Sequence, residues 1–355
     1  MTLLPFAILF VACVELGQLV LPIGSTGAPG FWIPSGLLLG GLASSSRRRW
    51  PGQIGLAAGV VIVSSVAHGA SPFTAAVLAL TTVLQGTGGA WLLLRLAPMG
   101  FTLNRLADAS ALVASSGTAA VVGALLPVVL SPARAIDMWQ DWALASVLGL
   151  VLFAPLVIAW RDEWRDHFEL NSRPRTIELA IALTLTIVVS QLVFGGVVPE
   201  AVQLPSLVLP FFIWSAFRFG PAASSLTVLV ICLTGVAYTT HGLGPLAMPD
   251  VAVDYPIFRG QAAAGMAAVC FLLLASVAAE RAQALAEIRT LRGFIPICAW
   301  CHKVRDDEGF WQRLETYLGA NTDATISHSI CPSCSEKQHH AVENQAVGTG
   351  NPWKI

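Results

Sequence analysis

The sequence predicts an all-α polytopic membrane protein with about 8–10 transmembrane helices, followed by a small cysteine-bearing module. Three observations carry this prediction. The 355 residues are 55% hydrophobic and only 12% charged, which is about half the charge of a typical soluble domain. Apolar runs recur with short gaps through the first 280 residues, and no lysine occurs before Lys303. Two Cys-x2-Cys pairs then follow near the C-terminal end.

Ten apolar segments can be drawn as helices, and several are short for a hydrocarbon core of about 30 Å. The short segments are rich in Gly and Pro, which predicts broken or re-entrant helices. The first segment has neither a basic region before it nor a small-residue cleavage site after it, so we interpret it as a retained helix rather than a signal peptide. The predicted spans are Leu3–Leu21, Phe31–Ser45, Pro51–Ala67, Thr74–Leu94, Ala107–Leu130, Trp139–Trp160, Ile177–Val198, Leu204–Phe219, Ala222–Tyr238 and Gln261–Ala279.

The arginines predict the orientation of these helices. If the N-terminus lies in the cytoplasm and the spans alternate, only Arg134 and Arg259 fall outside, as the positive-inside rule favours. Both termini are then cytoplasmic, in a reducing compartment where cysteines favour metal over disulfides. The arginines of the inner gaps are Arg47, Arg48, Arg49, Arg95, Arg105, Arg161, Arg165, Arg173, Arg175, Arg218 and Arg281.

The last predicted span leaves the membrane without a break. Gln261–Ala279 is almost wholly apolar over 19 residues, and the polar sequence after it contains no Pro or Gly until Gly293. One helix is therefore expected to cross the bilayer and continue into water. Val277, Ala284 and Leu291 repeat at heptad spacing, so a homodimeric coiled coil is a hypothesis, although two heptads fall short of the usual requirement.

Short matches at a common offset of 171 to 173 positions raise the hypothesis of a parallel internal repeat. Each match alone is weak in so apolar a chain, but their shared order favours a duplication. The offset spans six helices, so both copies keep one orientation, and parallel repeats often form a site at their interface. The matches are Gln18-Leu19-Val20 with Gln191-Leu192-Val193, Pro34-Ser35 with Pro205-Ser206, His68-Gly69 with His241-Gly242, and Pro72 with Pro245.

The pairs Cys298-x2-Cys301 and Cys331-x2-Cys334 predict a structural Zn2+ site. One such turn points two thiolates at an ion, and a second turn completes a tetrahedral site. A module this small cannot build an adequate core, so metal binding would supply much of its folding free energy. His328 is the alternative ligand, and redox-active thiols or spare cysteines are the alternatives to zinc. Four thiolates leave no open coordination position, so no catalysis is expected at the metal.

The change from apolar to charged sequence after residue 280 sets the predicted domain boundaries. They are a membrane domain at 1–280, an exit helix at 281–293, a zinc module at 294–338 and a disordered tail at 339–355. Between the cysteine pairs, Asp306–Gly309 is expected to turn. After it, Trp311, Leu314, Tyr317 and Leu318 are expected to share one helical face.

A few side chains within the spans are candidates for binding a small-molecule ligand. Glu15 is costly in lipid and is expected to face the bundle interior, where it could bind a cation, relay protons or pack as a neutral acid. His68 and His241 stand at equivalent outer ends of the two repeats, where they could line a pocket, sense pH or only cap turns. Asp141 near the outer face has similar standing. Trp32 is a further candidate that also fits an interfacial aromatic belt.

A set of motifs runs through residues 3–282. They are Phe31-Trp32-Ile33-Pro34-Ser35-Gly36, Arg48-Arg49-Trp50-Pro51-Gly52, Trp142 through Gly149 to Phe153-Ala154-Pro155, Leu204-Pro205, Pro210, Trp214, Arg218-Phe219-Gly220 and Ala279-Glu280-Arg281. Together they resemble the first class of bacterial membrane-associated sensor domains (MASE type). The resemblance implies an input domain of the bacterial inner membrane, of the kind that precedes histidine kinases, diguanylate cyclases and phosphodiesterases. The family usually carries an Asp where Ser146 stands here, so no role is carried over for that acid.

The tail has a resemblance of its own. Its motifs are Ile295 through Asp307, Gly309-Phe310-Trp311, His328 and Cys331-Pro332-Ser333-Cys334. They resemble a short cysteine module attached to bacterial signalling proteins, with Ser329 where that module usually has Gly. The resemblance implies a place in signalling but no defined biochemical activity.

These observations favour a sensory receptor that is not an enzyme. The sequence after Arg281 shows no Gly-Gly-Asp/Glu-Glu-Phe signature, nucleotide loop or phosphoacceptor context. A ligand-dependent rearrangement of the exit helix would be passed to the zinc module and to a cytoplasmic signalling protein in trans. A small-molecule or ion transporter built from parallel repeats is the alternative, and an enzyme with a separately encoded catalytic part is a third. The net charge of −1 predicts no nucleic-acid partner.

Overall fold

The structure is a computed structural model that describes residues 3–20, 30–97, 101–130, 132–167, 173–199, 203–247, 254–292, 297–305, 309–321 and 329–337. The chain divides into two compact units, Met1–Ala284 and Leu285–Ile355.

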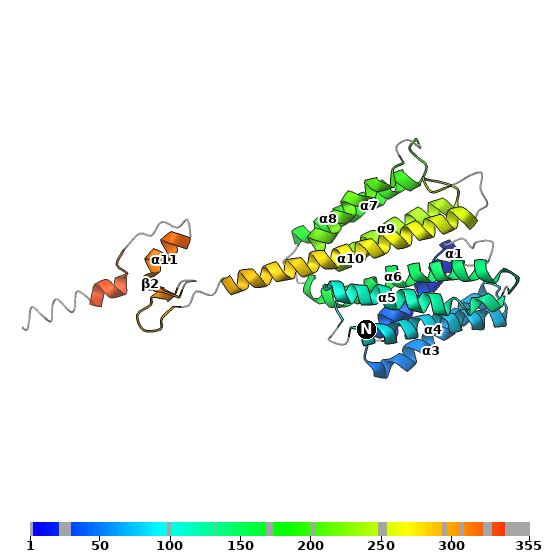
Figure 1. The fold of residues 1–355 in the computed structure, drawn as a ribbon, viewed down its shortest axis with the longest axis horizontal. Coiled ribbons are helices and arrows are strands. Elements are labelled where there is room, and N and C mark those ends of the chain that lie inside the picture. Colours follow the sequence, from blue (N-terminus) through cyan, green and yellow to red (C-terminus); the bar gives the residue numbers. More distant parts are fainter. Residues whose placement is uncertain are drawn as a thin grey trace, which may run out of the picture. The chain divides into compact units, whose positions relative to one another are not determined.

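The first unit is all-helical, and its long helices run side by side (Figure 1). Seven of the described helices are long and apolar enough to cross a membrane, and three shorter apolar helices lie at Leu3–Glu15, Ile33–Ala43 and Pro205–Phe219. Each of the ten predicted spans therefore coincides with a helix, but seven of the described helices are long enough to span, fewer than the 8–10 transmembrane helices predicted. The helices are α1 (Leu3–Val20), α2 (Ile33–Ala43), α3 (Trp50–Ala67), α4 (Pro72–Leu96), α5 (Leu106–Gly123), α6 (Ala135–His167), α7 (Arg173–Phe194), α8 (Leu209–Phe219), α9 (Pro221–Thr240) and α10 (Asp254–Arg292).

Helix α2 is the main departure from the predicted spans. The expected span Phe31–Ser45 contains a helix of only 11 residues, which is about 16 Å long and covers roughly half of a hydrocarbon core. Pro34 suits its first turn, where the N–H that proline lacks has no intrahelical partner. All residues from Ile33 to Leu42 are buried. Protein therefore encloses α2, which is the condition for an interrupted helix at membrane depth.

Glycines let α2 lie directly against its neighbours α4 and α6. A Cβ added to Gly36 would lie 1.9 Å from the carbonyl oxygen of Gly149 on α6, and a Cβ added to Gly149 would lie 2.0 Å from the carbonyl oxygen of Trp32. On the α4 side, a Cβ on Gly86 would come within 2.7 Å of Leu38. The backbones of α2 and α6 are therefore in direct contact, and larger residues would separate them.

The other helices form two groups. Helices α3, α4, α5 and α6 pack in sequence order, and α1 packs against α2 and α3. Helices α7, α8 and α9 form the second group, which joins the first where α9 packs against α6. The main hydrophobic core extends across this junction, with Phe10 of α1, Leu148 of α6 and Phe212 of α8 all fully buried.

The two groups share an order of elements that is consistent with the hypothesis of an internal repeat. In each, an 11-residue helix (α2 or α8) precedes a longer helix (α3 or α9) with Pro in its first turn. His68 ends α3 with φ −89° and His241 ends α9 with φ −90°, and Gly69 and Gly242 follow with φ of +88° and +74°. The correspondence does not extend to Pro72, the first residue of α4, because its counterpart lies in a turn before α10.

The second unit contains a small hairpin and short helices. Strand β1 (Val304–Arg305) pairs antiparallel with β2 (Trp311–Gln312), and α11 (Leu314–Asn321) and a helical turn at 332–337 follow. The prediction that Trp311 shares a helical face with Leu314 is therefore wrong. The chain reverses at Gly309, whose φ of +91° suits glycine, and this reversal pairs Trp311 with Arg305. The tail expected at 339–355 lies outside the described residues.

Candidate ligand-binding and output sites

Trp32 lies in a buried polar cluster where α2, α4 and α6 meet. Its exposed fraction is 7%. Its backbone N–H donates to the carbonyl oxygen of Ala145 at 2.9 Å, and its indole N–H donates to Thr82 Oγ1 at 3.1 Å. Its ring meets that of Trp142 edge-on, with centroids 5.0 Å apart. These contacts fix the start of α2 inside the bundle.

Two buried glutamines belong to the same region and were missed from the sequence. Gln85 Nε2 donates to Ser146 Oγ at 2.8 Å, and Gln261 Nε2 of α10 donates to the carbonyl oxygen of Gly30 at 3.0 Å. The Oε1 atom of each glutamine is buried without a partner in the described structure. A buried, unpaired acceptor costs about 1–3 kcal/mol. A glutamine within an apolar span was the sequence signal that could have identified both.

Glu15 and His68, two of the sequence candidates, lie together. Glu15 Oε2 on α1 is 3.7 Å from His68 Nε2 at the end of α3. His68 Nδ1 is 2.9 Å from the carbonyl oxygen of Ser64. The Glu15 side chain is 40% exposed. Glu15 therefore lies at the edge of the bundle, which differs from the expectation that it faces the bundle interior.

The other two candidates lie elsewhere. His241 ends α9 in the second group of helices, with Nδ1 2.7 Å from the carbonyl oxygen of Ala237. In the described residues its ring has no acidic side chain within ion-pair distance. Asp141 is partly buried on α6, beside the Trp142 that contacts Trp32. Among the sequence candidates, Glu15 and His68 are therefore within ion-pair distance of each other, whereas His241 lies in the other group of helices.

A small pocket with a cavity volume of about 20 Å³, enough for about one water molecule, lies where α6, α9 and α10 meet. Its wall is mostly apolar and includes Pro155 of α6, Ser224 and Ser225 of α9, and Phe271 of α10. Pro155 lies inside α6, where it interrupts the helical hydrogen-bond ladder. Because α10 lines this pocket, a molecule bound there would touch the helix that ends the membrane unit.

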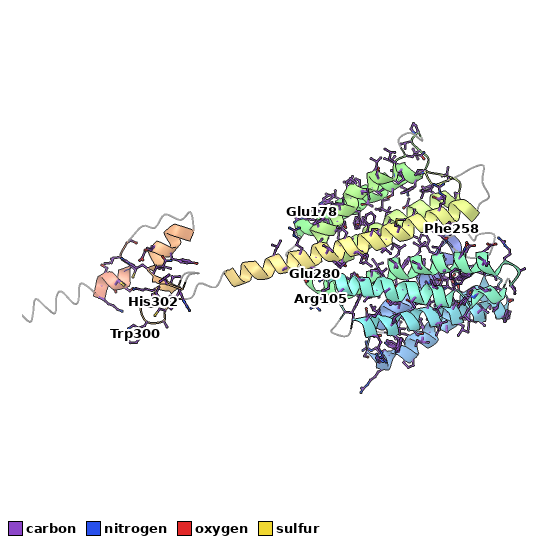
Figure 2. All side chains as sticks on the ribbon, in the orientation of Figure 1. Arg105, Glu178, Phe258, Glu280, Trp300 and His302 are labelled. Carbon is purple, nitrogen blue, oxygen red and sulfur yellow. The ribbon has the colours of Figure 1, made fainter. Side chains whose placement is uncertain are left out.

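Helix α10 runs as one helix of 39 residues from Asp254 to Arg292. Glu280 Oε2 on α10 accepts a hydrogen bond from the backbone N–H of Leu106, the first residue of α5, at 3.0 Å. Arg105, the N-cap residue of α5, provides no side-chain cap. In Figure 2, Glu280 and Arg105 lie together at the end of the unit opposite Phe258. Glu280 therefore caps α5 and stabilises its N-terminal dipole from another helix.

A second polar contact lies at this end of the membrane unit. Arg218 Nε and Nη2 donate to both carboxylate oxygens of Glu178 at 2.9 to 3.0 Å. This bidentate pair connects α7 to the end of α8, and Figure 2 places Glu178 at the same end as Glu280. Charged contacts therefore gather where α10 leaves the bundle.

The first cysteine pair forms a tight turn. The Cys298 N–H donates to the carbonyl oxygen of Lys303 at 2.8 Å, and the His302 N–H donates to that of Cys298 at 2.9 Å. His302 closes the turn with φ +57°, which few residues adopt. The Cys301 backbone N–H donates to Cys298 Sγ at 3.5 Å. The amides of Cys301 and Trp300 stabilise the thiolate and lower the pKa of Cys298.

The second cysteine pair begins a helical turn. The Cys334 N–H donates to the carbonyl oxygen of Cys331 at 3.1 Å, and Ser333 Oγ is 3.2 Å from Cys331 Sγ. The Ser333 hydroxyl, with help from the Cys334 amide, lowers the pKa of Cys331 from 9.0 to about 7. A thiol that ionises near neutral pH is a ready metal ligand, because metals bind the thiolate.

The two cysteine turns are separate in the part of the chain that is described. No group of three or more His, Cys, Asp or Glu side chains there is placed to hold a metal ion. His328 lies outside the described residues. The donor chemistry fits zinc because both turns stabilise thiolates. Zinc binding by the four cysteines stays a prediction.

The described helices define a multi-pass membrane protein of the all-α class. The family model MASE1 matches residues 1–283, most of the chain. The protein belongs to this family, membrane-associated sensor domain 1, and the resemblance noted in its motifs is confirmed. The cysteine module lies beyond the matched residues. No curated protein and no solved structure matches the chain.

Proposed function

We propose that this protein is a receptor of the bacterial inner membrane in which α10 passes a ligand-dependent rearrangement to a zinc-bound cysteine module. Membership of a sensor-domain family supports the sensory role. The observation that carries the proposed route is the hydrogen bond from Leu106 to Glu280 on an unbroken α10. It ties the helix that leaves the membrane unit to the start of α5.

A ligand acts on such a receptor only if it binds one packing of the helices more tightly than another. Helix α10 contributes Phe271 to the pocket shared with α6 and α9, and its Gln261 holds the carbonyl oxygen of Gly30. A ligand at either place shifts α10 relative to α5. The contact between Glu280 and Leu106 is then made or broken, and the continuous helix carries the change beyond residue 284.

The charge distribution supports cytoplasmic termini. The exit end of the unit carries the ion pair of Arg218 with Glu178 and the N-cap Arg105. Arg47 lies 5.6 Å from the ring centroid of Trp50 at the start of α3. An excess of basic side chains at one membrane face is typical of the cytoplasmic side.

We assign the zinc ligands as Cys298, Cys301, Cys331 and Cys334. Bound zinc would join the two turns into one fold and act structurally. Between the first two cysteines, Trp300 is 94% exposed, and an exposed Trp is a favoured anchor for a protein partner. We infer that the module engages a cytoplasmic signalling protein in trans.

Thiol labelling tests the orientation. Cells expressing a variant with Cys13, Cys232 and Cys270 replaced by Ala are treated with a membrane-impermeant maleimide. Labelling is expected only after permeabilisation and metal chelation, because the remaining cysteines face the cytoplasm. Labelling in intact cells would place the module outside and reject the proposal. The unchelated, permeabilised sample is the control for metal protection.

Cross-linking tests transmission through α10. Cysteines are introduced singly at positions 281 to 285 of the full-length protein, and their cross-linking in membranes is compared with and without a demonstrated binder. The pattern is expected to shift, and Glu280→Gln is expected to alter it without a binder. An unchanged pattern under both conditions would count against α10 as the route.

Transport is the second candidate function. The half-length helices α2 and α8 stand at equivalent places in two groups, as do the broken helices of many transporters. Uptake of a candidate solute by proteoliposomes, abolished by Glu15→Ala, would favour this function. Uptake at the level of protein-free liposomes would exclude it for that solute.

A further inference from the structure

Glu15 and His68 form the contact on which this inference rests. Nε2 of His68 faces Oε2 of Glu15 at 3.7 Å, and the two side chains are 35% and 40% exposed. The two residues come from α1 and α3, which pack against each other. The pair is therefore only partly enclosed by protein, and it joins two packed helices.

The contact made by Nδ1, the other ring nitrogen of His68, determines whether Nε2 carries a hydrogen in the neutral ring. Nδ1 lies 2.9 Å from the carbonyl oxygen of Ser64. A carbonyl oxygen only accepts hydrogen bonds, so Nδ1 carries a hydrogen in the neutral and the charged ring. In the neutral ring, Nε2 then presents a lone pair to the carboxylate and the contact is repulsive. One added proton converts it to an N–H donor facing an acceptor.

Among the described residues from Leu3 to Ala97, no other charged side chain lies beside the pair. Cys13 is two positions from Glu15 on α1 and does not share its face. Helix α2 has no ionisable side chain. The arginines at the start of α3 and the end of α4 are a whole helix length from His68, about 27 Å along α3 and about 35 Å along α4. From Leu3 to Ala97 the described ionisable residues are Cys13, Glu15, Arg47, Arg48, Arg49, His68 and Arg95.

The second group of helices provides an internal comparison. His241 ends α9 as His68 ends α3, with Nδ1 2.7 Å from a backbone carbonyl. The position that corresponds to Glu15 at the offset between the histidines is Val188 on α7. The contact between a histidine ring and the last turn of its helix is thus present in both groups, whereas the acidic residue is present only in the first group. Glu15 is not needed to cap the helix.

We propose that Glu15 and His68 form a one-proton site that clasps α1 to α3 when the proton is bound and releases them when it leaves. The proton comes from the solvent at the end of α3 opposite its arginines and returns there. As an input for signalling, this site rests on the proposed function and makes the proton the ligand of the receptor.

Thermal unfolding of the full-length protein in lipid nanodiscs tests the site. Tm is measured at about pH 5 and about pH 8, which bracket ordinary histidine titration. Glu15→Gln and His68→Gln are each expected to lose the same part of the acid-dependent change in Tm, and the double variant is expected to lose no more. His241→Gln is expected to keep the wild-type change. Glu15→Gln leaves the helix cap intact, so it stays informative if His68→Gln does not fold.

Two results would overturn the proposal. If His68→Gln and His241→Gln alter Tm alike at both pH values, His68 is only a cap. If the losses of the single variants add in the double variant, the two residues titrate separately. Cross-linking at positions 281 to 285 at both pH values distinguishes the site from its output. If Tm shows the pH-dependent contact but the cross-linking pattern does not change, the proton site is supported and transmission through α10 is not.

Discussion

Glu280 Oε2 accepts the backbone N–H of Leu106 across 3.0 Å, so a side chain of α10 caps a helix that begins 174 positions earlier. The contact lies at the end of the membrane unit where Arg105 and Glu280 stand together (Figure 2). Release of α10 therefore exposes the N-terminus of α5. The two events are coupled because they share one hydrogen bond.

Loss of this cap is expected to lower the stability of the protein by a measurable amount. Glu280→Ala should lower the stability of the full-length protein by about 0.5–1 kcal/mol, because α5 has no side-chain cap of its own. Glu280→Gln keeps an acceptor and should fall between wild type and Ala. Arg281→Ala is the control and should stay within about 0.5 kcal/mol. Equal losses for both Ala variants in thermal unfolding would contradict the cap.

The close contact of α2 with α6 predicts that one methyl group at Gly149 is severely destabilising. In Gly149→Ala the new Cβ meets the Trp32 carbonyl oxygen at 2.0 Å, so a loss of about 3 kcal/mol or more is expected. Gly59→Ala on α3 is the control, since nothing lies within 4 Å of its added Cβ. Its effect should be within about 1 kcal/mol. Similar Tm values for the two variants would rule out the direct backbone contact.

The hydrogen bond between Gln85 and Ser146 is expected to show strong coupling. Ser146→Ala leaves the whole Gln85 amide buried without a partner, which should cost about 1–3 kcal/mol. Adding Gln85→Leu removes the unpaired group, so the double variant should be more stable than Ser146→Ala alone. A double-mutant cycle by thermal unfolding measures this coupling. Additive losses would show that the two side chains do not interact.

Zinc content tests the assignment of the cysteines. Protein purified after zinc-supplemented growth should contain about one zinc per chain by mass spectrometry. Cys298→Ser and Cys331→Ser should each remove most of it, and Cys270→Ser is the matched control. His328→Ala should retain the metal, because four thiolates complete the site. Less than about half an equivalent in the wild type would reject zinc, and loss in His328→Ala would make the histidine a ligand.

The acidity of Cys331 should depend on Ser333. With a pKa of about 7, the Cys331 thiolate forms as pH rises through neutrality and is lost below it. Ser333→Ala removes the largest cause of the lowering, so the pKa rises toward 9.0 and the thiolate fraction at pH 7 falls. Alkylation of Cys331 in metal-free protein at pH 7 should slow severalfold. Ser335→Ala, which keeps its backbone bond to Cys331, should react like wild type.

Most helices could be predicted because each is an apolar run bounded by Arg, Gly or Pro. The predicted span Pro51–Ala67 differs from α3 by one residue. The length of α2 could not be predicted, since Phe31–Ser45 is continuously apolar. The helix begins only after Trp32, whose backbone bonds to Ala145, and Gly36 contacts Gly149. Such tertiary contacts leave no local signal in the sequence.

The candidate residues of the site were individually visible in the sequence, but their pairing was not. Glu15 and His68 stood out as ionisable groups in apolar spans, whereas their contact depends on how α1 packs on α3. Trp311 has helical spacing from Leu314, yet strand pairing with Arg305 overrides this local pattern. The cap by Glu280 is equally a product of packing.

If α10 transmits the signal as proposed, its unbroken helix also restricts how the domain that follows it can be exchanged. One residue inserted into it turns everything downstream by about 100°, and four residues restore the facing to within roughly 40°. A different output domain can therefore replace the cysteine module only at junctions spaced by about whole helical turns. Gene fusions at other spacings would deliver the stimulus to the wrong side of their new domain.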